Sequence, residues 1–590
     1  MLSAALFLSA ALLSGAPDTL RTAVVTAERG VSVSRTDTIR IKNTSSISEV
    51  LSLSPGLVLA DYGGVAGLRS VNLRGLGSPH TTIRIDGIKV GNVQSGQSDL
   101  GMLGLENFGA TLVDYAQNSV DFITRRPEFG GRKLAGKVCT DGGSFGTFQP
   151  SARLDFKVSD RLSLGASAAG TVSRGDFSYG DGLRRENNDI SQIRSGLDAF
   201  GMTCCGDWTA KLYYSGSRRG TPGSTNWPST DRQTDRNAFA QARLRRHFGR
   251  YELNVSGKAA IDDLQYLSDW GCSDYSQKEL QLNTAHKFGV CRWLDVSAVA
   301  EFQRDCLEST DYAASRTAAT AIAGAALMLP RLKANLTLQW EGIFDDEGAG
   351  PLSVLSPSAD FRFRIIEGLD ALGFARRGFR APTFNELYYP GYGNPSLLPE
   401  DAVLTDLGIE FRRGFLRRWA FKSKLDVFRN HLTQKIVSAP SEENPSLWLP
   451  YNIGEVVCTG LDAEAAVSLD AAPRRKASLC ARYSYQNAEG VPYLAKHSVV
   501  ISASACAGLW SLSALWNLRA GRTDAYSPMP DYSTLDLSLR RDFPLRSRRE
   551  GSSAISLKLT CRNLTDCSYE TVSGYPMPGR SIMGGAEFSF

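Results

Sequence analysis

The sequence lacks several features that mark common protein classes. After its N-terminus it has no charge-free apolar run of 18 residues, and the richest apolar stretch, at 317–330, is shorter than that. A membrane-spanning helix needs about 20 mostly apolar residues, so helical spans are excluded. The chain also has no GxxxxGK[ST] phosphate loop, so it cannot drive a transport step with nucleotide energy of its own.

Signs of metal binding and catalysis are scarce as well. The chain has five His, and its 11 Cys show neither a CxxC motif nor a Cys/His spacing typical of a metal site. We therefore expect no catalytic residues, no metal site and no cofactor. The adjacent Cys204 and Cys205 are interpreted as part of a turn or strand end rather than as a redox site.

Composition narrows the fold class. The 66 basic and 61 acidic residues are scattered along the chain, so the net charge of +5 does not indicate nucleic-acid binding. With 42% hydrophobic residues and 56 Gly, the chain is too apolar for disorder and too rich in Gly for a helical array. A chain of 590 residues is also longer than a domain built around one ordinary hydrophobic core. An all-β chain with many turns fits these limits.

A period of two, the repeat of a β-strand, dominates from about residue 134 to the end. Apolar residues recur at every second position in 162–172, and in 332–340 they alternate with polar ones. A soluble β-sandwich would not need some 457 residues of this pattern. In a membrane barrel, by contrast, apolar and polar residues alternate along every strand of the wall. In 332–340 the apolar positions are Leu332, Ala334, Leu336, Leu338 and Trp340.

The two ends of the chain carry export and assembly signals. Residues 1–16 contain an apolar run of signal-peptide length, although no Lys or Arg precedes it and Pro17 follows it. A buried N-terminal helix is the alternative. Phe588 and the terminal Phe590 share one strand face, similar to the signal by which outer-membrane barrels are recognised for assembly. Any exported β-protein can also end in Phe.

Three N-terminal segments carry recognisable motifs: residues 23–29 (AVVTAER), 71–78 (VNLRGLGS) and 81–92 (TTIRIDGIKVGN). They are similar to the coupling segment and plug of the TonB-dependent receptors of the outer membrane, and the chain resembles most of all the vitamin B12 (cobalamin) branch of that family. Barrel motifs of the family are matched at 378–402, 451–464 and 563–580. The resemblance covers nearly the whole chain.

The resemblance implies an all-β transmembrane barrel of about 22 antiparallel strands with a small N-terminal α+β plug domain inside the lumen. Such a barrel suits the chain, because strands of ~9–11 residues and their connections would use the available length. The expected parts are a signal peptide at 1–16, a coupling segment at 17–30, the plug at 31–133 and the barrel at 134–590. The protein is expected in the outer membrane of a Gram-negative cell, surrounded by its lipid.

The resemblance also assigns roles to particular residues. Val24, Val25, Thr26 and Ala27 would pair as an added strand with the partner protein TonB, which supplies energy from the inner membrane. In the plug motifs Gly75 and Gly87 permit tight turns, and Ile83, Ile85 and Ile88 can fill a small sheet core. Arg74 and Asp86 either fix the fold of the plug or act directly in transport.

One departure concerns residues 109–126. This segment keeps Tyr115, Asn118 and a closing FITRR, but it lacks the Gly-Pro turn and the Gly-Gly pair usual in the family. The plug is expected to be shortened there, with a rearranged core or altered coupling.

The ligand is less well defined by sequence. Trp227 and Trp270 lie in segments 224–237 and 263–276, where aromatic residues among Asp and Ser suit a bulky amphipathic ligand. The second segment also fits a strand. Cobalamin is the first candidate because of the compact length, a ferric siderophore or haem is the second, and a glycan follows. A surface lipoprotein partner stays open. The other classes weighed are a passive porin, a barrel enzyme and a secreted adhesin.

Overall fold

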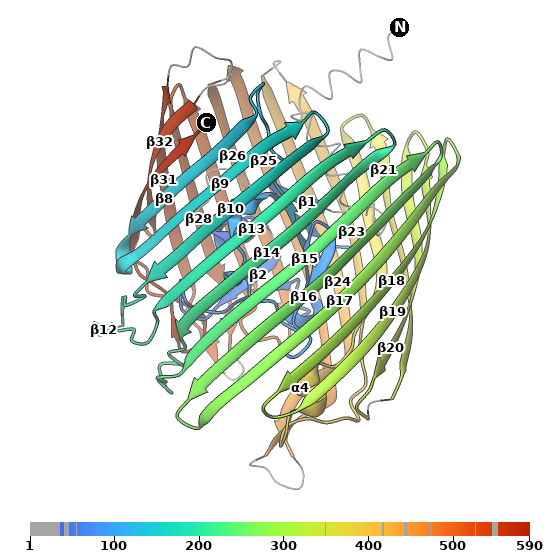
Figure 1. Ribbon diagram of the computed structural model, residues 1–590, viewed down its shortest axis with the longest axis vertical. Helices are drawn as coiled ribbons and strands as arrows, with labels where there is room; N and C mark the ends of the chain where they lie inside the picture. The colour runs from blue at the N-terminus through green and yellow to red at the C-terminus, as the bar shows by residue number, and fades with distance from the viewer. Residues whose placement is uncertain are drawn as a thin grey trace.

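The chain forms a large barrel with a small domain inside it (Figure 1). The computed structural model describes residues 36–40, 46–54, 56–180, 182–348, 350–415, 418–441, 447–472, 474–524, 527–545 and 553–590. The signal peptide and the coupling residues Val24 to Ala27 expected from the sequence lie outside these ranges.

The barrel consists of 22 strands, each paired antiparallel with its neighbours, as the sequence predicts. It closes where β35, the last strand, pairs with β8, the first. Closure leaves no unpaired strand edge in the wall. The strands are β8 (Leu134–Gly143), β9 (Thr147–Ser159), β10 (Leu162–Ser173), β13 (Ile190–Thr203), β14 (Gly206–Gly220), β15 (Arg232–Phe248), β16 (Tyr251–Ser268), β17 (Gly271–Cys291), β18 (Leu294–Ser309), β19 (Ala313–Met328), β20 (Leu332–Asp345), β21 (Leu352–Ile366), β22 (Leu369–Arg380), β23 (Glu400–Phe415), β24 (Trp419–Pro440), β25 (Trp448–Ala472), β26 (Arg475–Ala488), β27 (His497–Ala507), β28 (Trp510–Ala520), β31 (Tyr532–Leu545), β32 (Ser553–Arg562) and β35 (Ser581–Ser589).

The two rims of the barrel differ. Tight turns such as 249–250 and 508–509 join strands at the rim that carries the C-terminus, at the top of Figure 1. Longer connections at the opposite rim include 381–399, with helix α4 (Phe384–Tyr388), and 563–580. In outer-membrane barrels short turns face the periplasm and longer loops face the exterior. We therefore call the rim with α4 the outer mouth.

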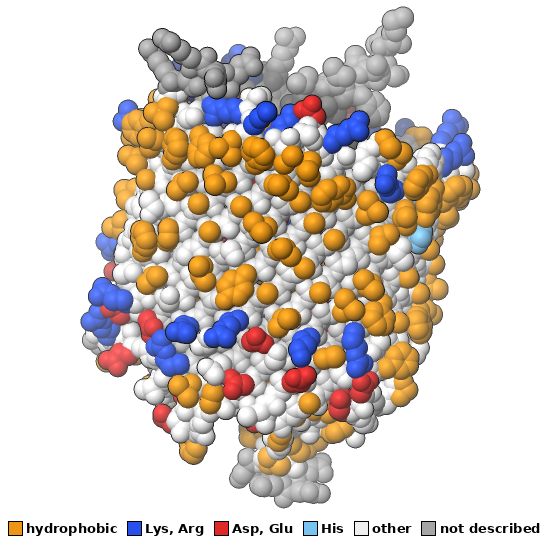
Figure 2. All heavy atoms as spheres, in the orientation of Figure 1, with side chains coloured by type: hydrophobic (Ala, Val, Ile, Leu, Met, Phe, Trp, Pro, Cys, Tyr) orange, Lys and Arg blue, Asp and Glu red, His pale blue; other side chains and the backbone are white. Residues whose placement is uncertain are grey.

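Side chains alternate between the two faces of the wall. In β10 the residues Leu164, Ala166, Ala168 and Val172 are exposed, whereas their neighbours are buried inside. Figure 2 shows apolar side chains over the middle of the wall, with Lys and Arg along the upper edge and charges of both signs toward the outer mouth. An apolar outer band between two charged edges is what lipid contact requires.

Three connections between the long barrel strands carry small paired strands at the outer mouth. The small strands are β11 (Ser178–Tyr179), β12 (Leu183–Arg184), β29 (Arg522–Thr523), β30 (Pro528–Met529), β33 (Glu570–Val572) and β34 (Tyr575–Pro576).

Of the helices in the described part of the chain, none is long and apolar enough to cross a membrane.

The domain inside the lumen is the plug. Its main sheet has the order β1-β6-β7-β4-β5, and β2 pairs with β3 beside it. Ile83, Ile85 and Ile88 are buried in this sheet, as the sequence predicts. The plug elements are β1 (Thr36–Arg40), α3 (Ile47–Ser52), β2 (Leu57–Asp61), β3 (Arg69–Leu73), η2 (Ser78–His80), β4 (Thr82–Ile85), β5 (Ile88–Val90), η3 (Leu100–Met102), η4 (Leu105–Asn107), β6 (Phe108–Asp114) and β7 (Ser119–Thr124).

The segment expected to be shortened forms a plain hairpin. Strands β6 and β7 pair antiparallel across it, and Tyr115 is fully buried at the turn. Asn118 takes a positive φ of 47°, a conformation that Asn tolerates better than most residues. A tight turn therefore joins β6 to β7.

The plug packs its apolar core mainly against one sector of the barrel wall. Its buried core is continuous with apolar residues on the inner face of β22 to β25, among them Phe374, Phe428, Leu432 and Val456. Farther round the wall, at β28, β31 and β32, cavities separate the plug from the wall. The plug is thus held more closely along one sector than along the other.

Candidate functional site

Arg74 joins the plug to the barrel. Its side chain is almost fully buried, and its guanidinium donates to Asp406 on β23 (2.7 Å) and to Asp462 on β25 (2.8 and 3.1 Å). It lies between two rings, 4.5 Å from the centroid of Tyr115 in the plug and 4.0 Å from that of Phe428 in the wall. From the sequence, Arg74 was expected either to fix the plug's own fold or to act in transport. In the structure its ion partners belong to the barrel.

Gly75 allows Arg74 this close approach. Both residues have positive φ angles, 52° for Arg74 and 76° for Gly75. A Cβ atom on Gly75 would lie 2.8 Å from the Sγ atom of Cys458, which is buried on β25. Any larger residue would push this turn of the plug away from the wall.

Asp86 and Gly87 form the tight turn between β4 and β5, with φ angles of 52° and 89°. The Asp86 carboxylate accepts a hydrogen bond from the backbone N–H of Thr124 (2.7 Å) and pairs with Lys211 on β14 (3.1 Å). Asp86 therefore fixes both the plug's sheet and its position in the barrel. Further pairs between plug and wall are Asp37–Lys424 (2.6 Å), Asp99–Arg219 (2.8 Å) and Glu106–Arg194 (3.1 Å).

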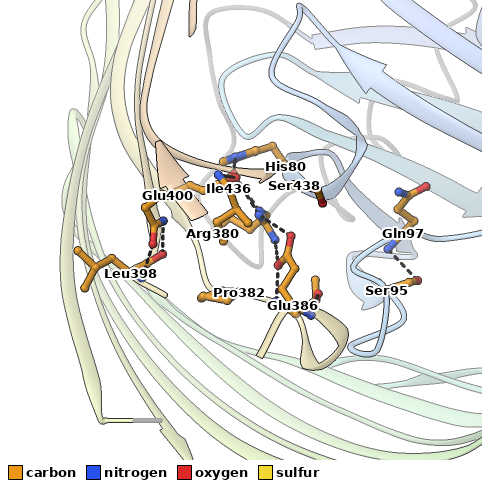
Figure 3. A network of polar contacts seen from close by, with 12 residues as sticks. His80, Ser95, Gln97, Arg380, Pro382, Glu386, Leu398, Glu400, Ile436 and Ser438 are labelled. Carbon is orange, nitrogen blue, oxygen red and sulfur yellow. Dashed lines mark hydrogen bonds and ion pairs between the residues drawn. The ribbon is translucent and has the colours of Figure 1, made fainter. Parts of the chain in front are cut away.

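A chain of ionic contacts connects the plug to the outer mouth (Figure 3). His80 of the plug contacts the carboxylate of Glu400 at the start of β23. Arg380 at the end of β22 bridges Glu400 (2.8 and 2.9 Å) and Glu386 in α4 (2.8 and 3.1 Å). Glu400 is buried, and a buried carboxylate is costly unless hydrogen bonds and a counter-charge compensate it. Arg380 and His80 together supply that compensation, so the three side chains depend on one another.

Helix α4 also docks directly on the plug. The backbone N–H groups of Phe384 and Asn385 donate to the carbonyls of Val93 (3.1 Å) and Gln94 (3.0 Å), which lie in the plug loop after β5. Glu386 caps the helix by bonding back to the N–H of Thr383 (2.7 Å). The mouth connection that contains α4 and the plug loop therefore form one hydrogen-bonded unit, which we call the α4 latch.

The two tryptophans proposed for ligand contact lie apart from these contacts. Trp227 is in the connection between β14 and β15 and is 82% exposed. Trp270 is in the two-residue turn between β16 and β17 and is 99% exposed. Segment 263–276 is thus mostly strand, in agreement with the second of the two interpretations. Both side chains are free to meet a ligand that arrives from outside.

Other residues singled out by sequence have simple places in the fold. Cys204 and Cys205 form the tight turn between β13 and β14, as expected, with 3.3 Å between their sulfur atoms. The rings of Phe588 and Phe590 stack with 5.2 Å between centroids, next to the closing strand pair. Gly136 on β8 leaves room for the Phe590 ring, since a Cβ atom there would overlap it.

Sequence reasoning missed several residues that connect the plug to the wall. His80 lies in η2 of the plug, whereas Arg380, Asp406 and Asp462 are polar residues on barrel strands. Such residues are common throughout the wall, so no local pattern distinguished them. The sequence did identify segment 378–402, which contains the α4 latch, as a motif similar to the family's. It did not show which residues this segment contacts.

Comparisons with known proteins agree with this arrangement. Residues 140–564 match the family model of the TonB dependent receptor-like β-barrel, and residues 24–124 match that of the TonB-dependent receptor plug domain. The vitamin B12 transporter BtuB of Photobacterium profundum is 24% identical over 484 residues, 74% of this chain and 72% of the relative. BtuB of Vibrio vulnificus is 22% identical over 75% of each chain.

A solved structure shares the fold over almost its full length. The siderophore receptor PirA from Acinetobacter baumannii superposes with a TM-score of 0.74 at 13% identity, covering 95% of this chain and 98% of that one. The family model of the barrel alone spans most of the chain. With a closed barrel of 22 strands, a plug in its lumen and both family models matched, the chain belongs to the TonB-dependent receptors, which are transporters of the outer membrane and not enzymes.

Proposed function

We propose that this receptor takes up cobalamin. The observation that carries the substrate is the similarity to two proteins named vitamin B12 transporters over about three quarters of the chain. A ferric siderophore is the second candidate, because the fold is shared with a siderophore receptor. Fold alone does not select a ligand, so the sequence relatives carry more weight.

The plug explains why uptake needs energy from a partner. It fills the lumen and is tied to the wall through buried ion pairs such as Arg74 with Asp406 and Asp462. A bulky ligand passes only when the plug moves. We propose that TonB binds residues 17–30 and supplies this movement by pairing with Val24 to Ala27 as an added strand.

A single substitution tests the coupling segment. Val25→Pro removes a backbone N–H that strand pairing requires. Uptake of labelled cyanocobalamin by cells should fall to the level of a strain without TonB, whereas binding to the same cells should not change. Val25→Thr keeps the N–H and the β-branched shape, so it should transport normally. Unchanged uptake by Val25→Pro would place the segment elsewhere, with Asp18, Thr19 and Leu20 as the next choice.

Calorimetry on the purified receptor tests the ligand. Cyanocobalamin, ferric enterobactin and haem are titrated into the same preparation, and we expect tight binding of cyanocobalamin. If Trp227 and Trp270 line the site, Trp227→Ala and Trp270→Ala should each weaken binding by ~1–3 kcal/mol. Trp510→Ala, on the outer wall near the opposite rim, should have no effect. Heat from ferric enterobactin with none from cyanocobalamin would overturn the substrate and leave the transporter class intact.

A further inference from the structure

A cavity of about 250 Å³ lies between the plug and the wall, outside the sector β22 to β25 against which the apolar core of the plug packs. Its wall is formed by β28, β31 and β32, and its outer end reaches the connection between β32 and β35. The plug side is formed by residues near α3 and β2. Lining residues with polar or aromatic character include Asn517, Arg519, Arg522, Tyr532, Arg562 and Tyr569.

Arg522 is buried in this cavity without a carboxylate partner. The residue is 4% exposed, and its guanidinium donates to the backbone carbonyls of Glu570 (2.6 Å) and Pro530 (2.6 Å). Its Nε atom is buried and makes no hydrogen bond. The guanidinium lies 4.5 Å from the ring centroid of Tyr532, which stacks on Tyr569.

Arg519 stands beside it on the inner face of β28. Its only hydrogen bond in the described part of the chain goes to the carbonyl of its neighbour Leu518 (3.2 Å). Two carboxylates, those of Asp531 and Glu570, lie close enough to Arg522 to interact with its charge. Both are hydrogen-bonded to backbone groups instead: Asp531 accepts from the N–H of Gly521 and Glu570 accepts from the N–H of Gly574, both at 2.8 Å. Within the described residues, neither arginine forms an ion pair.

Several other buried arginines of the lumen are neutralised, although Arg185, also buried, donates to the backbone carbonyl of Gly223. Arg74 meets two aspartates, Arg153 meets Asp155 (3.0 Å) and Asp198 (2.9 Å), and Arg219 meets Asp99 (2.8 Å). A buried charge without a counter-charge is costly. Burial lowers the pKa of Arg522, and its neighbours do not offset that effect. The buried Arg522, with the half-buried Arg519 beside it, is therefore a place where an anion would be stabilised.

We propose that this cavity binds an anionic group, a phosphate or a carboxylate, of the transported nutrient. Arg519 and Arg522 supply the positive charge, and the free Nε atom of Arg522 supplies a donor. The Oδ1 atom of Asn517, also buried without a partner, accepts from an N–H or O–H group next to the anion. The stacked rings of Tyr532 and Tyr569 form an apolar surface beside it. Arg562 and Asp536, which interact with each other, lie in the same cavity.

This assignment rests on the proposed uptake function, but its test separates the two. The variants are Arg519→Gln, which gives up only a bond to a neighbouring carbonyl, and the double variant Arg519→Gln/Arg522→Gln. Arg541→Gln is the control, because Arg541 is exposed and lies over Trp510 near the other rim. The probes are cyanocobalamin, which has a phosphodiester, dicyanocobinamide, which keeps the corrin ring but lacks that group, ferric citrate, which has carboxylates, and inorganic phosphate.

We expect the anionic nutrient that binds the wild type to bind Arg519→Gln about 10- to 100-fold more weakly, as for the loss of a charged hydrogen bond. The double variant should be weaker still. Dicyanocobinamide should bind all proteins alike, so a matching loss for this probe contradicts the assignment. If the variants bind cyanocobalamin more weakly, the bound group is a phosphate. If they bind ferric citrate more weakly, it is a carboxylate.

Inorganic phosphate makes the test independent of the nutrient. It should raise the unfolding temperature of the wild type and of Arg541→Gln, but not that of the double variant. Equal shifts in all proteins, or none in any, would overturn the anion site. Failure of the uptake proposal would show instead as no uptake of labelled cyanocobalamin by cells that carry the wild-type receptor, a measurement that these binding and unfolding experiments do not involve.

Discussion

Replacing Arg74 with Leu should loosen the plug inside an intact barrel. The change removes the guanidinium that Asp406 and Asp462 share and leaves both carboxylates buried. Breaking a buried ion pair by removing one partner costs ~3–5 kcal/mol. The stacking of Arg74 between Tyr115 and Phe428 is lost as well. We expect faster proteolysis of the plug and passage of large antibiotics that the wild type excludes.

Two further variants isolate the cause. Adding Asp406→Asn and Asp462→Asn to Arg74→Leu removes the two carboxylate charges that the guanidinium of Arg74 had compensated, so much of the protection against protease should return. Arg541→Leu changes an exposed arginine on the barrel and should behave as the wild type. Full protection of the plug in Arg74→Leu would show that the plug is held by its apolar core on β22 to β25 and not by this ion pair.

Replacing Arg380 with Met should release the α4 latch from the plug. Arg380 is the residue in the chain of contacts that touches both Glu400 and Glu386. Without it the two carboxylates face each other, and the cap of α4 loses its support. The amide protons of Phe384 and Asn385, which are donated to the plug, report the docking. A loss of ~3 kcal/mol would speed their hydrogen exchange by about 100-fold.

The same strand supplies a matched control. Arg377 pairs with Asp401 (2.7 Å) at the exposed outer face of the wall. Exposed ion pairs contribute ~0–1 kcal/mol, so Arg377→Met should leave the exchange of both amides unchanged. Unchanged exchange in Arg380→Met would mean that the backbone bonds to Val93 and Gln94 hold the latch by themselves. In that case the contacts that link His80 and Glu400 of the plug–wall contact to Glu386 would not be needed for docking of α4.

The strands of the barrel could be predicted because their signal is local. Each side chain in the wall faces either outward or into the lumen, so apolar and polar residues alternate along a single strand. The face that carries Leu164, Ala166, Ala168 and Val172 is indeed the outer one. Two turns were predictable for the same reason, since Gly75 and Gly87 are glycines and tolerate the positive φ angles that they adopt.

Segment 263–276 shows where local reasoning fails. Beyond the lipid band a barrel strand is surrounded by water on its outer face, so its composition becomes that of a surface loop. Strands β16 and β17 continue through this region to the turn at 269–270. Sequence composition alone therefore left both a loop and a strand open, and the pairing of the two strands decided between them.

The sequence by itself determined the class of protein: period-two strands, a plug motif and a family resemblance are written in consecutive residues. Only the tertiary structure showed what the plug motifs hold, because Arg74 meets Asp406 and Asp462 more than 300 positions away along the chain. Inward polar residues look alike in sequence whether they are paired or not. The barrel's closure and register bring them together, so the neutralised Arg74 and the unpaired Arg519 and Arg522 become distinguishable only in the folded chain.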